Sequence, residues 1–204
     1  KSLANLKYEG SIALDGMTEG DGGAAILDTK IKSDSFYFED YFLGKTEVNA
    51  RYEKGFLKLS NFAGAVDELK YTGNILLHLS DPADIQGHVE MPELDLKNLA
   101  LVFNRKTTLP FQISGRGTGQ IDFHGPLALS KLNYTLTTQI DQGVVANEVF
   151  RQLHYNIHAV NGHVYTDRVD FKKGEGLVTL TGEVANNGDL NVAVSTQDLH
   201  LSDL

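Results

Sequence analysis

Three histidines stand close together in the sequence and are the first residues to test for chemistry. His154 and His158 would share one face of a helix, and His163 follows five residues later. Imidazole is a common metal ligand. The zinc-protease pattern His-Glu-x-x-His, however, needs a glutamate directly after its first histidine, and Tyr155 occupies that place. We therefore interpret these histidines as exposed strand residues and expect no metal site.

Two glycine-rich stretches invite a ligand-binding interpretation. The string Gly115-Arg-Gly117-Thr-Gly119 resembles a phosphate-binding loop, but such loops need a fixed spacing and a helix start. Here the next residues, 120–123, alternate as in a strand. The acidic stretch 15–23 resembles a calcium loop, but Met17 falls where an oxygen ligand is required. We interpret the first string as strand bends and the second as a hairpin tip.

The sequence has no pattern that indicates catalysis. It lacks cysteine, a Gly-x-Ser-x-Gly elbow and a His-Glu-x-x-His motif. Carboxylates such as Glu39, Asp40 and Glu68 fall on polar faces or in turns, with no sign of a pocket around them. We therefore expect no enzymatic activity, no catalytic residue and no cofactor.

The apolar residues carry a clearer pattern, which indicates a repeat protein. An apolar residue, four mixed residues and then an apolar-x-apolar-x-x-apolar group occur from Val89 to Leu99. Related copies start at Ile31, Ile140 and Val194, and Asn147 replaces one apolar residue of the third copy. A regular period is typical of architectures whose units cannot bury their apolar faces alone. We predict four units of about 51–58 residues, with motif starts at 31, 89, 140 and 194, in a single segment covering 1–204.

A second marker precedes each of these motifs in the same order. It is an alternating stretch of the form apolar-x-Gly-x-Ile/Val-x-apolar. Because side chains alternate across a strand, each glycine shares a face with the following Ile or Val. Glycine on an apolar face marks a bulge, a bend or a close approach. We predict that the sheet is bent at these four glycines, which are Gly10, Gly73, Gly119 and Gly182.

These alternating stretches predict an all-β chain with almost no helix to cover its apolar face. About 15 strands can be counted, and breaks are expected near 33–35, 91–93 and 196–198. Residues 94–103 are predicted as a strand, and the only predicted helix is short, at 146–154, where Val145, Val149 and Leu153 are spaced four apart. A sheet this wide curls or splits. A sandwich, a barrel and a curled trough all satisfy the pattern.

Composition limits the partners. The formal net charge of −9 disfavours nucleic acid and anionic membrane surfaces, which both require a surplus of Lys and Arg. No apolar run has the length of a membrane span. Lys1 is not an initiator Met and no signal peptide follows, so we expect a fragment of a longer array whose membrane anchor lies outside it.

The Gly-x-Ile strands followed by Leu-x-Leu-x-x-Leu groups, in an acidic chain without cysteine, resemble the AsmA-like superfamily of Gram-negative envelope proteins, which includes the AsmA, TamB and YhdP types. The resemblance covers all four units, and Asn147 with the predicted helix beside it departs from the pattern. The resemblance implies an elongated antiparallel repeat sheet curled into a groove or taco, with at most one short helix. It also implies a periplasmic location and a part in outer-membrane biogenesis.

From this resemblance we predict a periplasmic segment of a lipid-conducting bridge between the inner and outer membranes, carrying phospholipid or other acyl chains. An outer-membrane protein is a further expected partner at one end of the full-length chain. The alternatives are a scaffold for outer-membrane protein assembly acting by β-strand addition and a closed structural sandwich or solenoid. The residues predicted to line the lipid-binding groove are Ile12, Leu14, Phe36, Phe38, Ile75, Leu77, Leu79, Leu94, Leu96, Ile121, Phe123, Val178, Leu180, Leu199 and Leu201.

Overall fold

A computed structural model of the chain describes residues 7–21, 25–38, 41–102, 112–127, 131–145, 147–184 and 189–200. These residues form one open antiparallel sheet of 13 strands and one short helix, as the sequence predicts. The elements are β1 (Tyr8–Glu9), β2 (Ala13–Glu19), β3 (Ile26–Phe38), β4 (Tyr41–Glu53), β5 (Phe56–Val66), β6 (Leu69–His78), β7 (Asp84–Asp95), α1 (Leu96–Val102), β8 (Ile113–Pro126), β9 (Asn133–Val145), β10 (Glu148–Val160), β11 (His163–Lys173), β12 (Gly176–Val184) and β13 (Leu190–Gln197).

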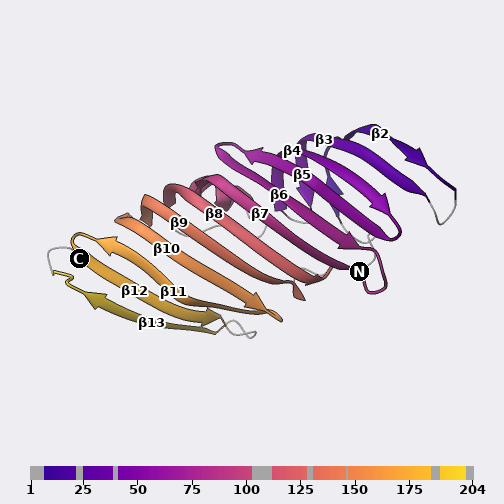
Figure 1. The fold of residues 1–204 in the computed structure, drawn as a ribbon. Helices are drawn as coiled ribbons and strands as arrows, with labels where there is room; N and C mark the ends of the chain where they lie inside the picture. The colour runs from indigo at the N-terminus through magenta and orange to yellow at the C-terminus, as the bar shows by residue number, and fades with distance from the viewer. Residues whose placement is uncertain are drawn as a thin grey trace.

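The strand order follows the chain order. From β3 to β13 every strand pairs with the next strand in sequence, and β1 and β2 both pair with β3 (Figure 1). Strands therefore lie side by side along the whole molecule. At about 4.8 Å per strand the sheet is on the order of 50 Å long. The predicted elongated antiparallel sheet is confirmed.

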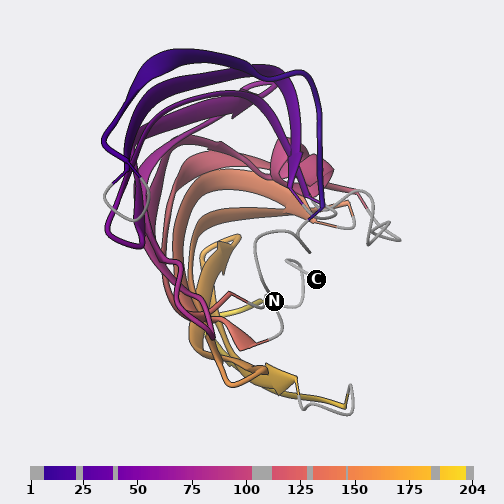
Figure 2. The ribbon, with the colours of Figure 1, turned by 90° about the vertical axis from the view of Figure 1, so that its right-hand side faces the viewer.

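The sheet curls into an arch that is open on one side (Figure 2). Register shifts interrupt the ladders at 33–36, 59–62, 91–94, 151–154 and 166–169. A bulge adds residues to one strand of a pair, bends that strand and increases its twist. Two of these shifts coincide with the breaks predicted near 33–35 and 91–93. Repeated bulges thus account for the curl.

The helix is not where the sequence predicts it. Residues 94–103 are predicted as a strand, but α1 occupies Leu96–Val102. The Asp95 side chain accepts a 3.0 Å hydrogen bond from the Asn98 backbone N–H, which is the geometry of a helix N-cap. This cap, followed by Leu96 and Leu99 three residues apart, favours the helical turn over the strand.

The predicted helix at 146–154 is wrong, because residues 148–160 form β10. Asn147 has a positive φ of 72° in the turn from β9, and Gln152 has a φ of 52° in a bulge. The bulge places Phe150 and Leu153, three residues apart, on the same face, which imitates helical spacing. Val149 instead lies on the other face and is 51% exposed.

The prediction that the acidic stretch 15–23 is a hairpin tip is wrong in part. Residues 13–19 continue as strand β2 along β3, where Gly16 pairs with Thr29. A Cβ on Gly16 would lie 2.5 Å from the Thr29 side chain, so glycine lets the two strands approach here. Residues 22–24 lie outside the described part of the chain.

The four apolar motifs start in β3, β7, β9 and β13. Successive motifs are therefore four, two and four strands apart. The interval from β7 to β9 contains fewer strands because α1 also lies in it. All four strands run in the same direction through the alternating sheet. The division into four units of about 51–58 residues stays a prediction. Because the four strands run in the same direction, the ends of the motifs lie toward one edge of the sheet.

Candidate apolar groove

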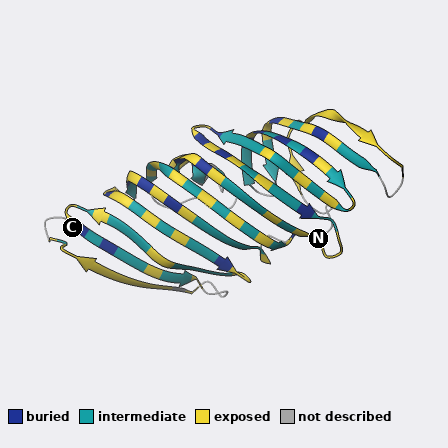
Figure 3. Cartoon of the chain, in the orientation of Figure 1, coloured by how far each residue is buried: buried dark blue, intermediate teal, exposed yellow. Residues whose placement is uncertain are grey.

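One face of the sheet is apolar and turned into the arch. Along β8, half-buried residues at odd positions from Ile113 to Gly125 alternate with exposed polar residues at even positions. The same alternation of shielded and exposed residues continues through the neighbouring strands (Figure 3). In a sheet of period two, this pattern gives one inward apolar face and one outward polar face.

Cross-strand pairing joins the inward side chains into rows. One row passes through Leu59, Ile75 and Gly87 to Phe123, and another through Val89, Ile121, Leu136 and Ile157. Most of these side chains are half-buried rather than fully buried. They form the floor of the arch, which we call the groove floor.

Charge is almost missing from this face. Among the described, ladder-paired residues of β2 to β13 that face inward, only Glu148 and Lys173 are charged, and their side chains pair at 2.8 Å. Both stand at the ends of their strands. The groove floor between the strand ends therefore has no ionised group to bind a charged ligand.

Two apolar clusters close the sides of the groove. The larger one holds eight buried residues under and around α1, at the edge where β5, β7 and β9 end: Val66, Leu69, Tyr71, Met91, Leu94, Leu96, Ile140 and Phe150. The smaller one, at the opposite edge, consists of Leu77, Ala83 and Leu127. We call these the helix-side cluster and the loop-side cluster. The largest fully buried side chains all belong to the helix-side cluster: Leu69, Leu94, Ile140 and Val66.

The Tyr71 hydroxyl shows how the helix-side cluster tolerates a polar group. It donates a 2.6 Å hydrogen bond to the Leu43 carbonyl. Burial raises the pKa of Tyr71, so the phenol stays neutral. The cluster is thus uncharged as well as buried.

The fifteen predicted lining residues fall into distinct environments. Ile75, Ile121, Phe123 and Leu180 lie half-buried on the groove floor, and Phe36, Phe38, Leu79 and Leu199 are also half-buried. Leu94, Leu96, Leu77 and Val178 are 1%, 5%, 7% and 6% exposed and have almost no surface left for a ligand. Ile12 and Leu14 are 46% and 68% exposed near the β2 edge. Leu201 lies outside the described residues.

The four predicted glycines also differ. A Cβ on Gly10 or Gly73 would lie 2.1 or 2.3 Å from a neighbouring backbone carbonyl oxygen, so no side chain fits there. At Gly119 the nearest atom would be the Met91 Cε at 3.0 Å, and at Gly182 the Asn191 carbonyl oxygen at 3.0 Å. Gly10 has φ +134°, whereas the other three have no positive φ. The first two glycines serve close strand approach.

A hollow of about 240 Å³ opens near the C-terminal end of the sheet. Its wall is nearly all apolar and includes the inward side chains Ile157, Val164, Val169, Leu180 and Val192. It falls below the usual volume of a drug-sized pocket. The hollow suits a slender apolar ligand such as one hydrocarbon chain.

Sequence reasoning missed several groove-floor residues, among them Leu59, Val89, Leu136, Ile157 and Val169. They occupy strands between the motifs or the parts of motif strands that precede the leucines. Plain alternation of apolar and polar residues would have found them. The repeated leucines Leu94 and Leu96 are instead buried in the helix-side cluster.

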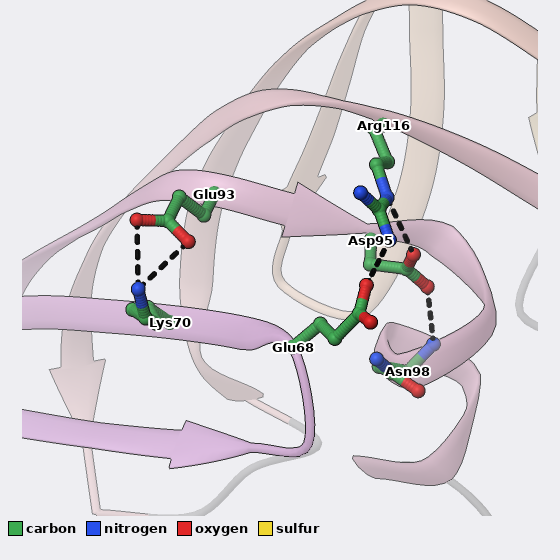
Figure 4. Close-up of polar contacts among 6 residues, drawn as sticks. All are labelled: Glu68, Lys70, Glu93, Asp95, Asn98 and Arg116. Carbon is green, nitrogen blue, oxygen red and sulfur yellow. Dashed lines mark hydrogen bonds and ion pairs between the residues drawn. The ribbon is translucent and has the colours of Figure 1, made fainter.

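The outward face carries ion pairs between neighbouring strands. Near α1, Arg116 pairs with Glu68 and lies 3.6 Å from Asp95, while Lys70 and Glu93 are 2.8 Å apart (Figure 4). His88 lies 2.6 Å from Asp122 on the next strand, and this hydrogen bond raises the pKa of His88. These polar contacts stabilise strand pairing outside the groove.

The predicted histidine group is dispersed over two strands. His158 lies 3.3 Å from Asp167, and His163 lies 3.1 Å from Glu183, while His154 is exposed. Within the described residues, no group of three or more potential ligands is placed to hold a metal ion. The described part of the chain also contains no helix long and apolar enough to cross a membrane.

The fold and the groove define the class of this protein as an open, single-sheet β-groove. Comparison of the chain with protein-family models, curated proteins and solved structures gave no match.

Proposed function

We propose that the chain binds acyl chains of phospholipid along its inward face and forms a segment of a lipid-conducting bridge in the periplasm. The observation that supports this most is the inward face itself. It is continuous, mainly apolar and free of charged side chains between the strand ends, with hydroxyls at a few positions such as Thr29, Thr46 and Thr138. No second layer of described residues covers its floor. An uncovered apolar surface of this extent marks a binding site.

Binding would be passive. Removal of acyl surface from water contributes about 25 cal/mol per Å², so a hydrocarbon chain needs no charged residue to hold it. Polar headgroups would stay at the open side of the arch, in water. The uncharged groove floor would allow a lipid to move along it, because no single position has a strong, specific interaction.

The location follows from the same proposal. A groove without its own lipid source needs a membrane at each end, and the AsmA-like resemblance suggests the inner and outer membranes of a Gram-negative envelope. The anchor to the inner membrane would then lie in a segment not present here, and an outer-membrane protein would contact the far end of the longer chain.

The test is a matched pair of substitutions. Ile121→Asp places a charge on the groove floor, and Thr137→Asp places it on the outward face of the next strand. Native mass spectrometry of the purified protein and titration with a fluorescently labelled phosphatidylethanolamine in detergent micelles measure lipid binding. We expect Ile121→Asp to reduce binding at least tenfold and Thr137→Asp to leave it unchanged.

The same pair distinguishes an open floor from a packed core. A partly exposed side chain can turn toward water. Ile121→Asp should therefore lower the free energy of unfolding by roughly 0.5–3 kcal/mol, as most single substitutions do, and should not unfold the protein. Equal lipid binding by both variants would refute lipid transport, and unfolding of Ile121→Asp would refute the open floor.

A second candidate function is β-strand addition to a client, and one observation favours it. Strand β13 ends the sheet with no charged residue from Leu190 to Gln197, and Val192 and Val194 are 51% and 60% exposed. Sheet edges are ordinarily protected by charge, proline or bulges. Ala193→Lys should block association with an outer-membrane protein precursor while lipid binding persists, and unchanged association would refute this function.

A further inference from the structure

The outward face carries a second hollow, on the other side of the sheet from the apolar hollow near its C-terminal end. It has a volume of about 550 Å³ and lies over β11, β12 and β13. The outward side chains around it are His163, Tyr165, Thr181, Glu183, Asn191 and Ala193. We call this the outer shelf.

Aromatic rings form one wall of the outer shelf. Tyr165 stacks with two imidazoles: its ring centroid is 5.1 Å from that of His158 and 5.5 Å from that of His163, with interplanar angles of 26° and 24°. His158 is fixed from the neighbouring strands by contacts with Thr135 at 3.2 Å and Asp167 at 3.3 Å. The wall is therefore held in place before any ligand arrives.

Polar groups form its floor in an ordered array. Glu183 Oε1 accepts a 3.1 Å hydrogen bond from Asn191 Nδ2, and its Oε2 lies 3.1 Å from His163 Nε2. Because a carboxylate only accepts, His163 Nε2 carries the proton in this contact. Cross-strand pairing places Asn191 directly beside Glu183, and Thr181 stands beside Ala193. Three polar groups remain to bind a ligand: the side-chain carbonyl of Asn191, its second side-chain N–H and the Thr181 hydroxyl.

We propose that the outer shelf binds a neutral sugar unit of a glycan. A sugar ring has an apolar C–H face, which suits an aromatic wall, and a rim of hydroxyls that both donate and accept, which suits an amide, a carboxylate and a hydroxyl. Glu183, Asp167 and Asp170 disfavour an anion here. An apolar ligand would leave the polar floor without partners. Because contacts within the protein already hold these side chains, less conformational entropy is lost when a ligand binds.

The experiment titrates the ¹⁵N-labelled protein with chitotetraose, cellotetraose and maltotetraose, each up to 10 mM, and follows backbone amide shifts by NMR. At least one sugar should shift amides around residues 163–165, 181–183 and 191–193 with a single dissociation constant. Tyr165→Ala and Asn191→Ala should each weaken that binding at least tenfold.

Phe56→Ala is the matched control, because Phe56 also stacks on a histidine, His78, on the outward face at a centroid distance of 4.5 Å. It should leave the dissociation constant unchanged. Absence of shifts with all three sugars overturns the proposal, as do shifts on the groove floor instead of the shelf, or equal losses in Phe56→Ala and Tyr165→Ala. Lipid binding by the inward face is measured separately and is independent of each outcome.

Discussion

At the scale of single residues, two inward glycines that look equivalent in the sequence face different neighbours. Gly73→Ala directs a methyl group at the His88 carbonyl oxygen, 2.3 Å away, which the rigid ladder cannot move. The atom nearest to the new methyl group in Gly119→Ala is the Met91 Cε at 3.0 Å, the far end of a flexible side chain, and the next, Leu94 Cδ2, is at an ordinary 3.4 Å. We expect Gly73→Ala to destabilise the protein by about 1–3 kcal/mol through overpacking and Gly119→Ala by less than half as much. Urea denaturation of both variants measures this, and equal losses would contradict the described packing.

At the scale of elements, α1 depends on its cap. Asp95 accepts the Asn98 backbone N–H, so Asp95→Ala should cost about 1 kcal/mol of unfolding free energy. Asp95→Asn keeps a side-chain oxygen for the cap but removes the charge that faces Arg116 at 3.6 Å. Because Arg116 is exposed, that ion pair contributes little. Thermal and urea denaturation should therefore show Asp95→Asn close to the unsubstituted protein. Equal destabilisation of both variants would mean that the ion pair, and not the cap, holds α1 in place.

At the scale of the whole molecule, histidine–carboxylate pairs on the outward face link strands along the sheet. They are His78–Asp84, His88–Asp122, His158–Asp167 and His163–Glu183. The hydrogen bond that His88 Nδ1 donates to Asp122 raises the pKa of His88 above 6.5; desolvation opposes this shift and Glu90 adds to it. A raised folded pKa gives stability that is complete below the unfolded pKa and is lost as pH rises through the folded pKa.

The contribution of His88 to thermal stability should therefore be lost as the pH rises above the ordinary histidine pKa of about 6.5, and His88→Gln should make this dependence shallower. His124→Gln is the control, because His124 is exposed on the same face and forms no ion pair among the described residues. The Asn191 and His163 hydrogen bonds lower the pKa of Glu183, so its contribution is lost only on acidification through the carboxylate range. A pH profile of melting temperature that is identical for the protein and His88→Gln would contradict this role of His88.

The amino-acid sequence by itself determined the alternation of the strands, the antiparallel hairpin order, the breaks near 33–35 and 91–93, and the lack of helices to cover the sheet. These properties depend on neighbours one or two residues apart and on turns, so local patterns carry them. For this reason the alternation alone predicts four of the residues on the inward face: Ile75, Ile121, Phe123 and Leu180.

Only the tertiary structure decided which apolar residues are sealed in clusters and which remain on the groove floor. Leu94 and Leu96 read like lining residues, but both are buried in the helix-side cluster. Leu96 is the first residue of α1, which depends on the Asp95 cap, and Leu94 pairs with Gly117 of β8, which is distant in the sequence. The bulge at Gln152 places Phe150 and Leu153 on the same face of β10, so a strand has the residue spacing of a helix. The outer shelf likewise joins residues from 163 to 193, because cross-strand contacts, and not sequence spacing, determine which side chains meet.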